Sequence, residues 1–264
     1  MTTSEEEIIF HLSQEEFFFL TQMLDINYIA GFGDPFQGYL MEELEEEYQK
    51  VRQRLMDRGF LIPIEGSDEL EMDELLGLCL TCCGSDTAVY LKKNDHEIGD
   101  YEAFLHFTPN LVVERTSDRD GIALTPVANA ELTMNILARF LPLTVRGEKP
   151  IHIILDEMNI NAWDALSSQE KGELLEAREI DLDVTADILS VETEPERLAT
   201  MSFWSRYGIG WEAESYRYSK RGSDLLLITE PDEKELCIRE YRPEPVLEAL
   251  ERLAAKFDLV NEGA

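Results

Sequence analysis

Basic side chains are scarce in this 264-residue sequence, which has 23 Lys and Arg against 55 Asp and Glu and a formal net charge of −32. The longest runs of adjacent basic residues are the pairs Lys92-Lys93 and Lys220-Arg221. Proteins that bind nucleic acid need a basic surface to displace counterions from the phosphates. Anionic membranes attract basic segments for the same reason. The composition therefore argues against a nucleic-acid partner and against a membrane surface.

Long apolar runs are missing as well. No stretch approaches the roughly 18 apolar residues of a membrane span. Residues 1–7 are acidic where a secretory signal is basic, and no apolar segment of the signal type follows them. We therefore expect a cytoplasmic protein.

Cysteine is rare, and its spacing does not match a zinc site. Cys79-x-x-Cys82 has no second pair of cysteines or histidines at matching spacing, although tetrahedral zinc needs four ligands. The motif ends an apolar segment, 75–80, whereas a thioredoxin-like motif begins a helix. We expect buried, free thiols, which suit a reducing compartment. The remaining cysteines are Cys83 and Cys237.

Recognisable catalytic and cofactor motifs are absent too. There is no G-x-S-x-G elbow, P-loop, H-E-x-x-H or EF-hand loop. Gly31-x-Gly33 lacks the third glycine of a dinucleotide-binding loop. Asp118-x-Asp120-Gly121 lacks the downstream Glu of a calcium loop and fits a hairpin turn. We predict no catalytic residue, cofactor or metal, and a protein that is not an enzyme. The four histidines are expected to be paired sheet or core side chains: His11, His96, His106 and His152.

Apolar periodicity predicts a chain of mixed helices and strands. The 44% hydrophobic and 9% aromatic content is ordinary for a globular fold. The first half is predicted to hold helices over 13–24, 42–58, 68–82 and 128–140, and strands over 87–91, 102–107, 111–114 and 122–124. The second is predicted to hold helices over 161–166, 168–178, 184–191, 194–199 and 245–257, and strands over 151–155, 201–205, 211–218, 225–229 and 236–239.

The two halves follow one plan. Each has a helix-rich stretch, four strands that end in a hairpin, and a closing amphipathic helix. Residues 111–113 of the first half correspond to 225–227 of the second. We predict an α+β fold of two similar halves, 1–146 and 147–264, with antiparallel sheet flanked by helical segments. These halves could share one compact domain.

The segment 203–211, Phe-Trp-Ser-Arg-Tyr-Gly-Ile-Gly-Trp, is the most unusual in the chain. Aromatic side chains beside Arg are typical of protein interfaces, but Trp is also usually buried, so a glycine turn between two buried strands is the alternative. The corresponding stretch of the first half, 92–100, is polar and predicted to be a loop. The residues predicted to bind a partner are Trp204, Arg206, Tyr207 and Trp211.

The order of elements, together with several short signatures, points to a known family. These signatures are the helix 15–24 before Asp34-Pro35-Phe36, the helix end at 54–61, the acidic start 68–71 before 75–78, the segment 223–227, and Arg242-Pro243-Glu244-Pro245 before the last helix. The layout resembles that of EspG proteins, which are cytosolic substrate chaperones of type VII (ESX) secretion in Gram-positive bacteria.

This resemblance implies two similar halves of antiparallel sheet flanked by helices, and no catalytic residues. It implies a chaperone or adaptor that binds a secreted helical-hairpin protein and keeps it soluble for export. The partner could be of the PE/PPE type, or of the WXG or LXG type in a low-GC relative. Two alternatives remain: an enzyme with an unrecognised carboxylate site, and an acidic decoy that binds a basic protein. The oligomeric state stays open.

Overall fold

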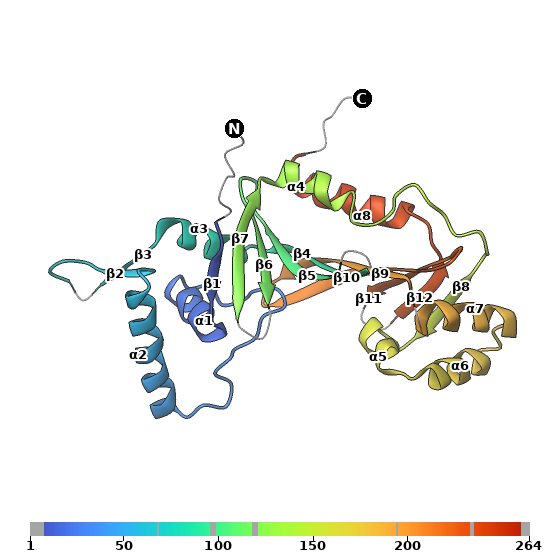
Figure 1. Ribbon diagram of the computed structural model, residues 1–264, viewed down its shortest axis with the longest axis horizontal. Helices are drawn as coiled ribbons and strands as arrows, with labels where there is room; N and C mark the ends of the chain where they lie inside the picture. The colour runs from blue at the N-terminus through green and yellow to red at the C-terminus, as the bar shows by residue number, and fades with distance from the viewer. Residues whose placement is uncertain are drawn as a thin grey trace. The chain divides into compact units, whose positions relative to one another are not determined.

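The computed structural model describes residues 8–67, 69–95, 99–117, 121–193, 195–232 and 235–259. Within these ranges, ten strands belong to one large sheet and two more form a small hairpin sheet. Every strand pair whose register is described is antiparallel. Helices accompany the strands in both halves of the chain (Figure 1). The predicted α+β fold class is therefore confirmed.

Most predicted elements are present, with shifted ends. The helices are α1 Gln14–Met23, α2 Met41–Asp57, α3 Glu74–Cys83, α4 Ala130–Leu137, α5 Ile160–Ala165, α6 Ser168–Ala177, α7 Leu182–Thr193 and α8 Glu244–Lys256. The strands are β1 Phe10–Leu12, β2 Leu61–Pro63, β3 Leu70–Met72, β4 Thr87–Asp95, β5 Gly99–Phe107, β6 Val112–Ser117, β7 Ile122–Ala128, β8 His152–Asp156, β9 Arg197–Tyr207, β10 Gly210–Arg221, β11 Asp224–Asp232 and β12 Glu235–Glu240. Residues 118–120 of the predicted turn between β6 and β7 lie outside the described residues.

The strand order of the first half recurs in the second. The main-sheet strands of the first half lie in the order β1-β7-β6-β5-β4, and those of the second in the order β8-β12-β11-β10-β9. In chain order, both read first, fifth, fourth, third, second. The division into 1–146 and 147–264 remains a prediction, and this recurrence supports it.

The chain forms two compact units that interleave along the sequence. Unit 1 comprises residues 1–88, 103–130 and 206–211, and unit 2 comprises 89–102, 131–205 and 212–264. Strands β4, β5, β9 and β10 each contribute residues to both units, because the unit boundaries fall within them, and another boundary falls after the first residue of α4.

In unit 1, helices α1 and α3 pack against β1, β6 and β7 (Figure 1). Helix α1 begins at the predicted capping box, in which the Ser13 hydroxyl accepts from Glu16 N–H and the Glu16 carboxylate accepts from Ser13 N–H. The box sets the helix so that Phe17 and Leu20 are fully buried. The three cysteines of α3 belong to the same apolar cluster. All four cysteines of the chain are free and buried, as predicted.

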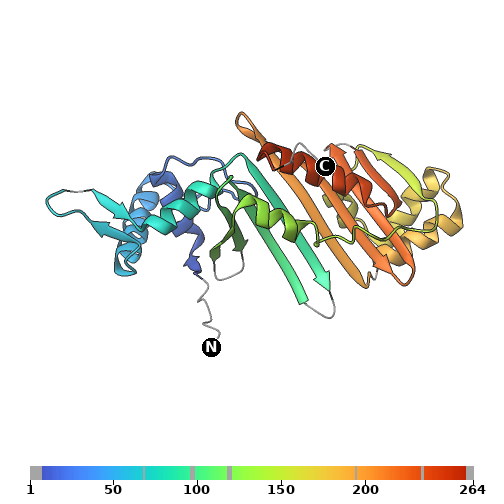
Figure 2. The same cartoon turned by 90° about the horizontal axis from the view of Figure 1, so that it is seen from above.

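In unit 2, helices α5, α6 and α7 cover an apolar face of the sheet. Trp163 of α5 and Ile188 of α7 are fully buried against strand residues such as Ile228 and Ile238. These strand positions alternate along β11 and β12, as expected for one face of a sheet. Figures 1 and 2 show α8 along the opposite face of the same strands. No helix within the described residues is long and apolar enough to cross a membrane.

One helix start and one whole helix predicted from the sequence are wrong. Residues 70–72 form β3, which pairs with β2, and α3 begins only after Asp73, whose carboxylate accepts from Leu76 N–H at 2.8 Å. The helix predicted over 194–199 is also wrong, because β9 begins at Arg197 and Glu196 N–H bonds to Lys220 O. In both cases pairing with another strand overrides local helix propensity.

The apolar side chains of α4 are not buried alike. Leu132, Ile136, Leu137 and Phe140 fall on one face of the helix predicted over 128–140. Leu132 and Ile136 are exposed, whereas Leu137 is fully buried together with Thr133. Periodicity shows that residues share a face of a helix, but packing decides which face is covered.

Candidate partner-binding surface

The aromatic segment 203–211 forms the end of a β-hairpin. Strand β9 ends at Tyr207, β10 begins at Gly210, and Gly208 adopts a φ of 63° between them. Left-handed backbone is what a two-residue hairpin loop requires, and glycine adopts it without a steric penalty. Gly208 thus allows the turn between the two strands.

The four predicted partner-binding residues differ in exposure. Tyr207 is 64% exposed, whereas Arg206, Trp204 and Trp211 are half-buried. Backbone N–H of Arg206 donates to Asp86 O at 2.9 Å, which anchors the tip in unit 1. Trp204 precedes Arg206 on β9 and belongs to unit 2. The structure therefore exposes Tyr207 largely and the other three side chains in part.

Ile209 is an exposed apolar residue that the sequence interpretation missed. It lies between Gly208 and Gly210 and is 80% exposed. A large aliphatic side chain flanked by glycines in a two-residue turn has no neighbours to pack against. This position in the sequence could have predicted that Ile209 is exposed. We call residues 206–211, with Tyr207 and Ile209 outermost, the hairpin tip.

The corresponding stretch of the first half, 92–100, is mostly strand. The loop predicted there is wrong, because β4 continues to Asp95 and β5 starts at Gly99. Residues 96–98, which include His96, lie outside the described residues. This hairpin carries polar pairs, with Glu102 accepting from Tyr90 Oη at 2.8 Å and lying 3.1 Å from Lys92 Nζ.

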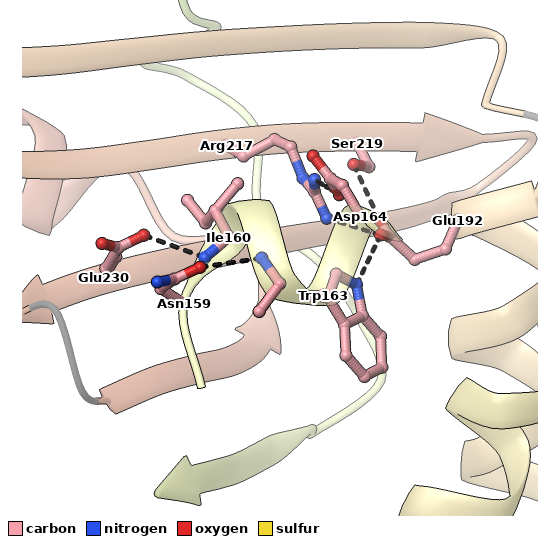
Figure 3. A network of polar contacts seen from close by, with 9 residues as sticks. Asn159, Ile160, Trp163, Asp164, Glu192, Arg217, Ser219 and Glu230 are labelled. Atoms are coloured by element: carbon pink, nitrogen blue, oxygen red, sulfur yellow. Dashed lines mark hydrogen bonds and ion pairs between the residues drawn. The ribbon is translucent and has the colours of Figure 1, made fainter. Parts of the chain in front are cut away.

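Unit 2 also contains a buried polar network (Figure 3). Nη2 of Arg217 lies 2.5 Å from Oε2 of Glu192, and each side chain is 4% exposed. The same carboxylate accepts from Trp163 Nε1 at 2.9 Å and from Ser219 Oγ at 3.1 Å. A second carboxylate, on Asp164, pairs with Arg217. Because Glu192 of α7 accepts from Trp163 of α5 and from Ser219 and Arg217 of β10, the network ties α5 and α7 to β10.

Four of the described acidic side chains have clearly shifted pKa values. A general acid needs a raised pKa. Among the described acids with a clear shift, the pKa is lowered in each case. Hydrogen bonds from Ser13 and Ser167 lower the pKa of Glu15 and Glu170. Against the opposing effect of burial, Tyr90 and Lys92 lower the pKa of Glu102, and Ile151 N–H and Arg242 lower that of Glu240.

The cysteine thiols have the opposite shift. Burial raises the pKa of Cys79 to about 11 and that of Cys82 to about 12. A reactive cysteine needs a lowered pKa. In the part of the chain that the structure describes, no group of three or more His, Cys, Asp or Glu is placed to hold a metal ion.

Comparison with known proteins finds a structure of similar fold but assigns the chain to no sequence family. No protein-family model matches the chain, and no curated protein sequence matches it. A solved structure does match: the Mycobacterium tuberculosis type VII secretion system chaperone EspG5 in complex with the PE25-PPE41 dimer. The TM-score is 0.53 at 10% sequence identity, over 97% of this chain and 98% of that one. The chain has an EspG-like fold. Because the likeness covers almost all of both chains, it extends to both halves of the molecule.

Proposed function

We propose that this chain is a cytoplasmic chaperone or adaptor, which binds a helical type VII secretion substrate and keeps it soluble for export. The observation that carries the proposal is the fold likeness to EspG5 over 97% of this chain. That protein is a chaperone, and its structure was determined in complex with a PE25-PPE41 dimer. The partner proposed here is a secreted helical-hairpin protein of the PE/PPE, WXG or LXG type.

The hairpin tip is the proposed contact surface, together with Trp204. It exposes Tyr207 and Ile209, whose apolar area is available to cover the apolar end of a helical hairpin. Arg206 lies on β9 next to Tyr207 and can pair or stack beside aromatic rings. The net charge of −32 would keep a complex of this kind soluble through mutual repulsion.

The test is recovery of the partner. The tagged full-length chain is incubated with lysate from a Gram-positive bacterium that has a type VII secretion system, and the bound proteins are identified by mass spectrometry. The expected result is enrichment of helical-hairpin secretion substrates, and co-expression in a heterologous host should then keep such a substrate soluble. Recovery of only ribosomal and metabolic proteins would contradict the proposal.

Matched variants make this test specific to the surface. Tyr207→Ala removes an exposed ring from the hairpin tip, and Tyr28→Ala removes a ring that is 41% exposed in a different segment of the chain. Only the first should reduce recovery of the substrate. Equal recovery by both variants would leave the chaperone role standing and would move the contact surface away from the hairpin tip.

A further inference from the structure

The start of helix α2 carries the longest run of consecutive, exposed, large apolar side chains in the described chain. Tyr39 is 49% exposed, Leu40 69% and Met41 85%. Met41 is the most exposed large apolar side chain that the structure describes. Single exposed apolar residues are common on protein surfaces, but consecutive ones form a patch that contacts something else more often than water.

Helix capping does not explain this run. Leu40 occupies the N-cap of α2, where its side chain makes no capping hydrogen bond. Ser, Thr, Asp and Asn are preferred at that position, and an apolar residue there costs about 1 kcal/mol. The N–H of Leu40 instead donates to the Glu43 carboxylate at 2.9 Å. Leu40 therefore improves neither the packing nor the capping of the isolated chain, which suggests a role outside its own fold.

The patch rests on an ordered turn. Phe36 N–H donates to the Asp34 carboxylate at 2.8 Å, and Tyr39 N–H donates to Phe36 O at 3.0 Å. The Tyr39 ring packs edge-on against Phe36 at 5.5 Å, and Phe36 is itself buried against Tyr48. A surface held in one conformation loses little conformational entropy on binding, so it binds more tightly than a flexible segment of equal area.

A rim of glutamates follows the apolar run: Glu42, Glu43, Glu45, Glu46 and Glu47. Glu43 binds Leu40 N–H, and Glu47 pairs with Lys50 at 2.6 Å. The other three form no ion pair with any residue that the structure describes. The helix dipole stabilises acidic side chains in the first turn of a helix, which accounts for some of these glutamates. Because the glutamates lie beside an exposed apolar run, a complementary partner surface must be both apolar and basic.

We propose that residues 39–47, the α2 patch, bind a basic amphipathic segment of a partner protein. Such a segment is a helix that carries large aliphatic side chains on one face, with Lys or Arg flanking them. Its aliphatic face covers Tyr39, Leu40 and Met41, and its cations lie against the unpaired glutamates. This site is additional to the hairpin tip and does not depend on the proposed chaperone function.

Charge separates this occupant from its rivals. A second copy of the chain would bring another net charge of −32, which opposes self-association. Anionic lipid and nucleic acid are repelled for the same reason. A basic segment is instead attracted from a distance, so its association rate should fall as salt rises.

The probe is a fluorescently labelled synthetic helix of 18 residues, about five turns long, built from Leu and Lys with the leucines on one face. Binding to the purified full-length chain is followed by anisotropy. Leu40→Ser/Met41→Ser should weaken binding at least tenfold, because it removes two large apolar side chains from the contact. Because serine is a preferred N-cap residue, loss of binding in this variant cannot be attributed to an unfolded α2.

The matched control is Leu182→Ser. Leu182 begins α7 and has the same 69% exposure as Leu40, but it lies in unit 2. It should change peptide affinity by less than about twofold, as expected for a surface residue outside the site. Equal weakening by the α2 variant and by this control would overturn the proposal, and so would unchanged affinity in the α2 variant.

A charge series tests the rim. Glu42→Gln/Glu45→Gln/Glu46→Gln should weaken binding and flatten its salt dependence. A control triple of exposed acids, Glu176→Gln/Glu248→Gln/Glu251→Gln, changes the net charge equally and should have a smaller effect. Equal effects would mean non-specific attraction to an acidic protein and would overturn the proposal. A dimer of the wild-type chain that Leu40→Ser/Met41→Ser separates in sedimentation would also overturn it, by making a second copy the occupant.

Discussion

The guanidinium of Arg217 and the carboxylate of Glu192 lie 2.5 Å apart and are each 4% exposed, although 25 residues separate them in the chain. Burying two charges is costly unless both are paired and the remaining polar atoms are satisfied. Here Trp163 and Ser219 donate to the carboxylate, and Asp164 shares the guanidinium. The pair therefore fixes α7 and α5 on strand β10 in one arrangement (Figure 3).

Glu192→Gln should lower the free energy of unfolding by about 3 kcal/mol, because it leaves a buried guanidinium with one partly exposed acid. Urea unfolding followed by circular dichroism measures the change. Glu47→Gln breaks an exposed pair, Lys50–Glu47, and should cost less than about 1 kcal/mol. If both variants lose the same stability, the buried pair is no more important than a surface ion pair.

The buried His106 should make stability depend on pH. Burial and the guanidinium of Arg115, 3.2 Å away, hold the pKa of His106 well below its ordinary value of 6.5. As the pH falls below 6.5, the unfolded chain therefore takes up a proton that the folded chain does not. Stability from this group is complete above that pH and is lost below it, at up to about 1.4 kcal/mol per pH unit.

The measurement compares the wild type with His106→Gln between pH 7.5 and pH 5. The amide keeps a neutral acceptor for Arg115, and the carboxylates titrate alike in both proteins. The wild type should lose more stability than the variant across this range. His152→Gln removes an exposed imidazole from strand β8 and controls for the loss of a histidine. Parallel curves for wild type and His106→Gln would show that the buried imidazole does not carry the effect.

Gly31 should tolerate no side chain. It adopts a φ of 64°, and a Cβ there would lie 2.1 Å from the Phe104 ring. Gly31→Ala should therefore combine left-handed strain with overpacking and cost about 2–5 kcal/mol. Gly38 has a φ of 97°, and a Cβ there would meet nothing within 4 Å, so Gly38→Ala should show backbone strain alone. Thermal unfolding of the two variants separates the contributions, and an equal shift would argue against crowding at Phe104.

The hairpin tip should contribute to partner binding through its rings. Tyr207→Ala/Trp211→Ala should weaken the proposed complex by about 2–4 kcal/mol. Tyr207→Ala alone should leave the free energy of unfolding within about 0.5 kcal/mol of wild type, because its ring is largely exposed. Calorimetric titration with the recovered substrate and urea unfolding provide the two readouts. If the double variant unfolds and Tyr207→Ala binds normally, these aromatic residues belong to the core.

Local signals predicted many elements of this fold correctly. Ser13 and Glu16 form the capping box that their spacing indicates, and the apolar context of Cys79 correctly predicted a buried thiol. Both predictions succeed because the determining partners lie within one or two helical turns. The start of α3 was wrong for the opposite reason, since Leu61 pairs with Met72 across a hairpin that residues 68–73 alone do not reveal.

The candidate surfaces were predicted less completely. The sequence drew attention to Tyr207 through its aromatic neighbours but missed Ile209, whose exposure follows from the turn it occupies. It also gave no reason to single out Leu40, because an apolar residue before a helix is equally compatible with a buried contact. Exposure depends on the packing of the whole chain, so a residue and its neighbours reveal it in some cases, as at Cys79, and not in others, as at Ile209 and Leu40.

The sequence by itself determined the acidic composition, the absence of common catalytic motifs, and the mixture of helices and strands, and it predicted one plan in two halves. These follow from composition and from periodicities that extend over a few residues. Only the tertiary structure decided that Arg217 meets Glu192, that Arg115 meets His106, and that α4 turns Leu132 outward. The first contact joins a helix to a strand and the second joins two strands, so neither follows from one element alone. Close packing also selects among faces that local periodicity leaves equivalent.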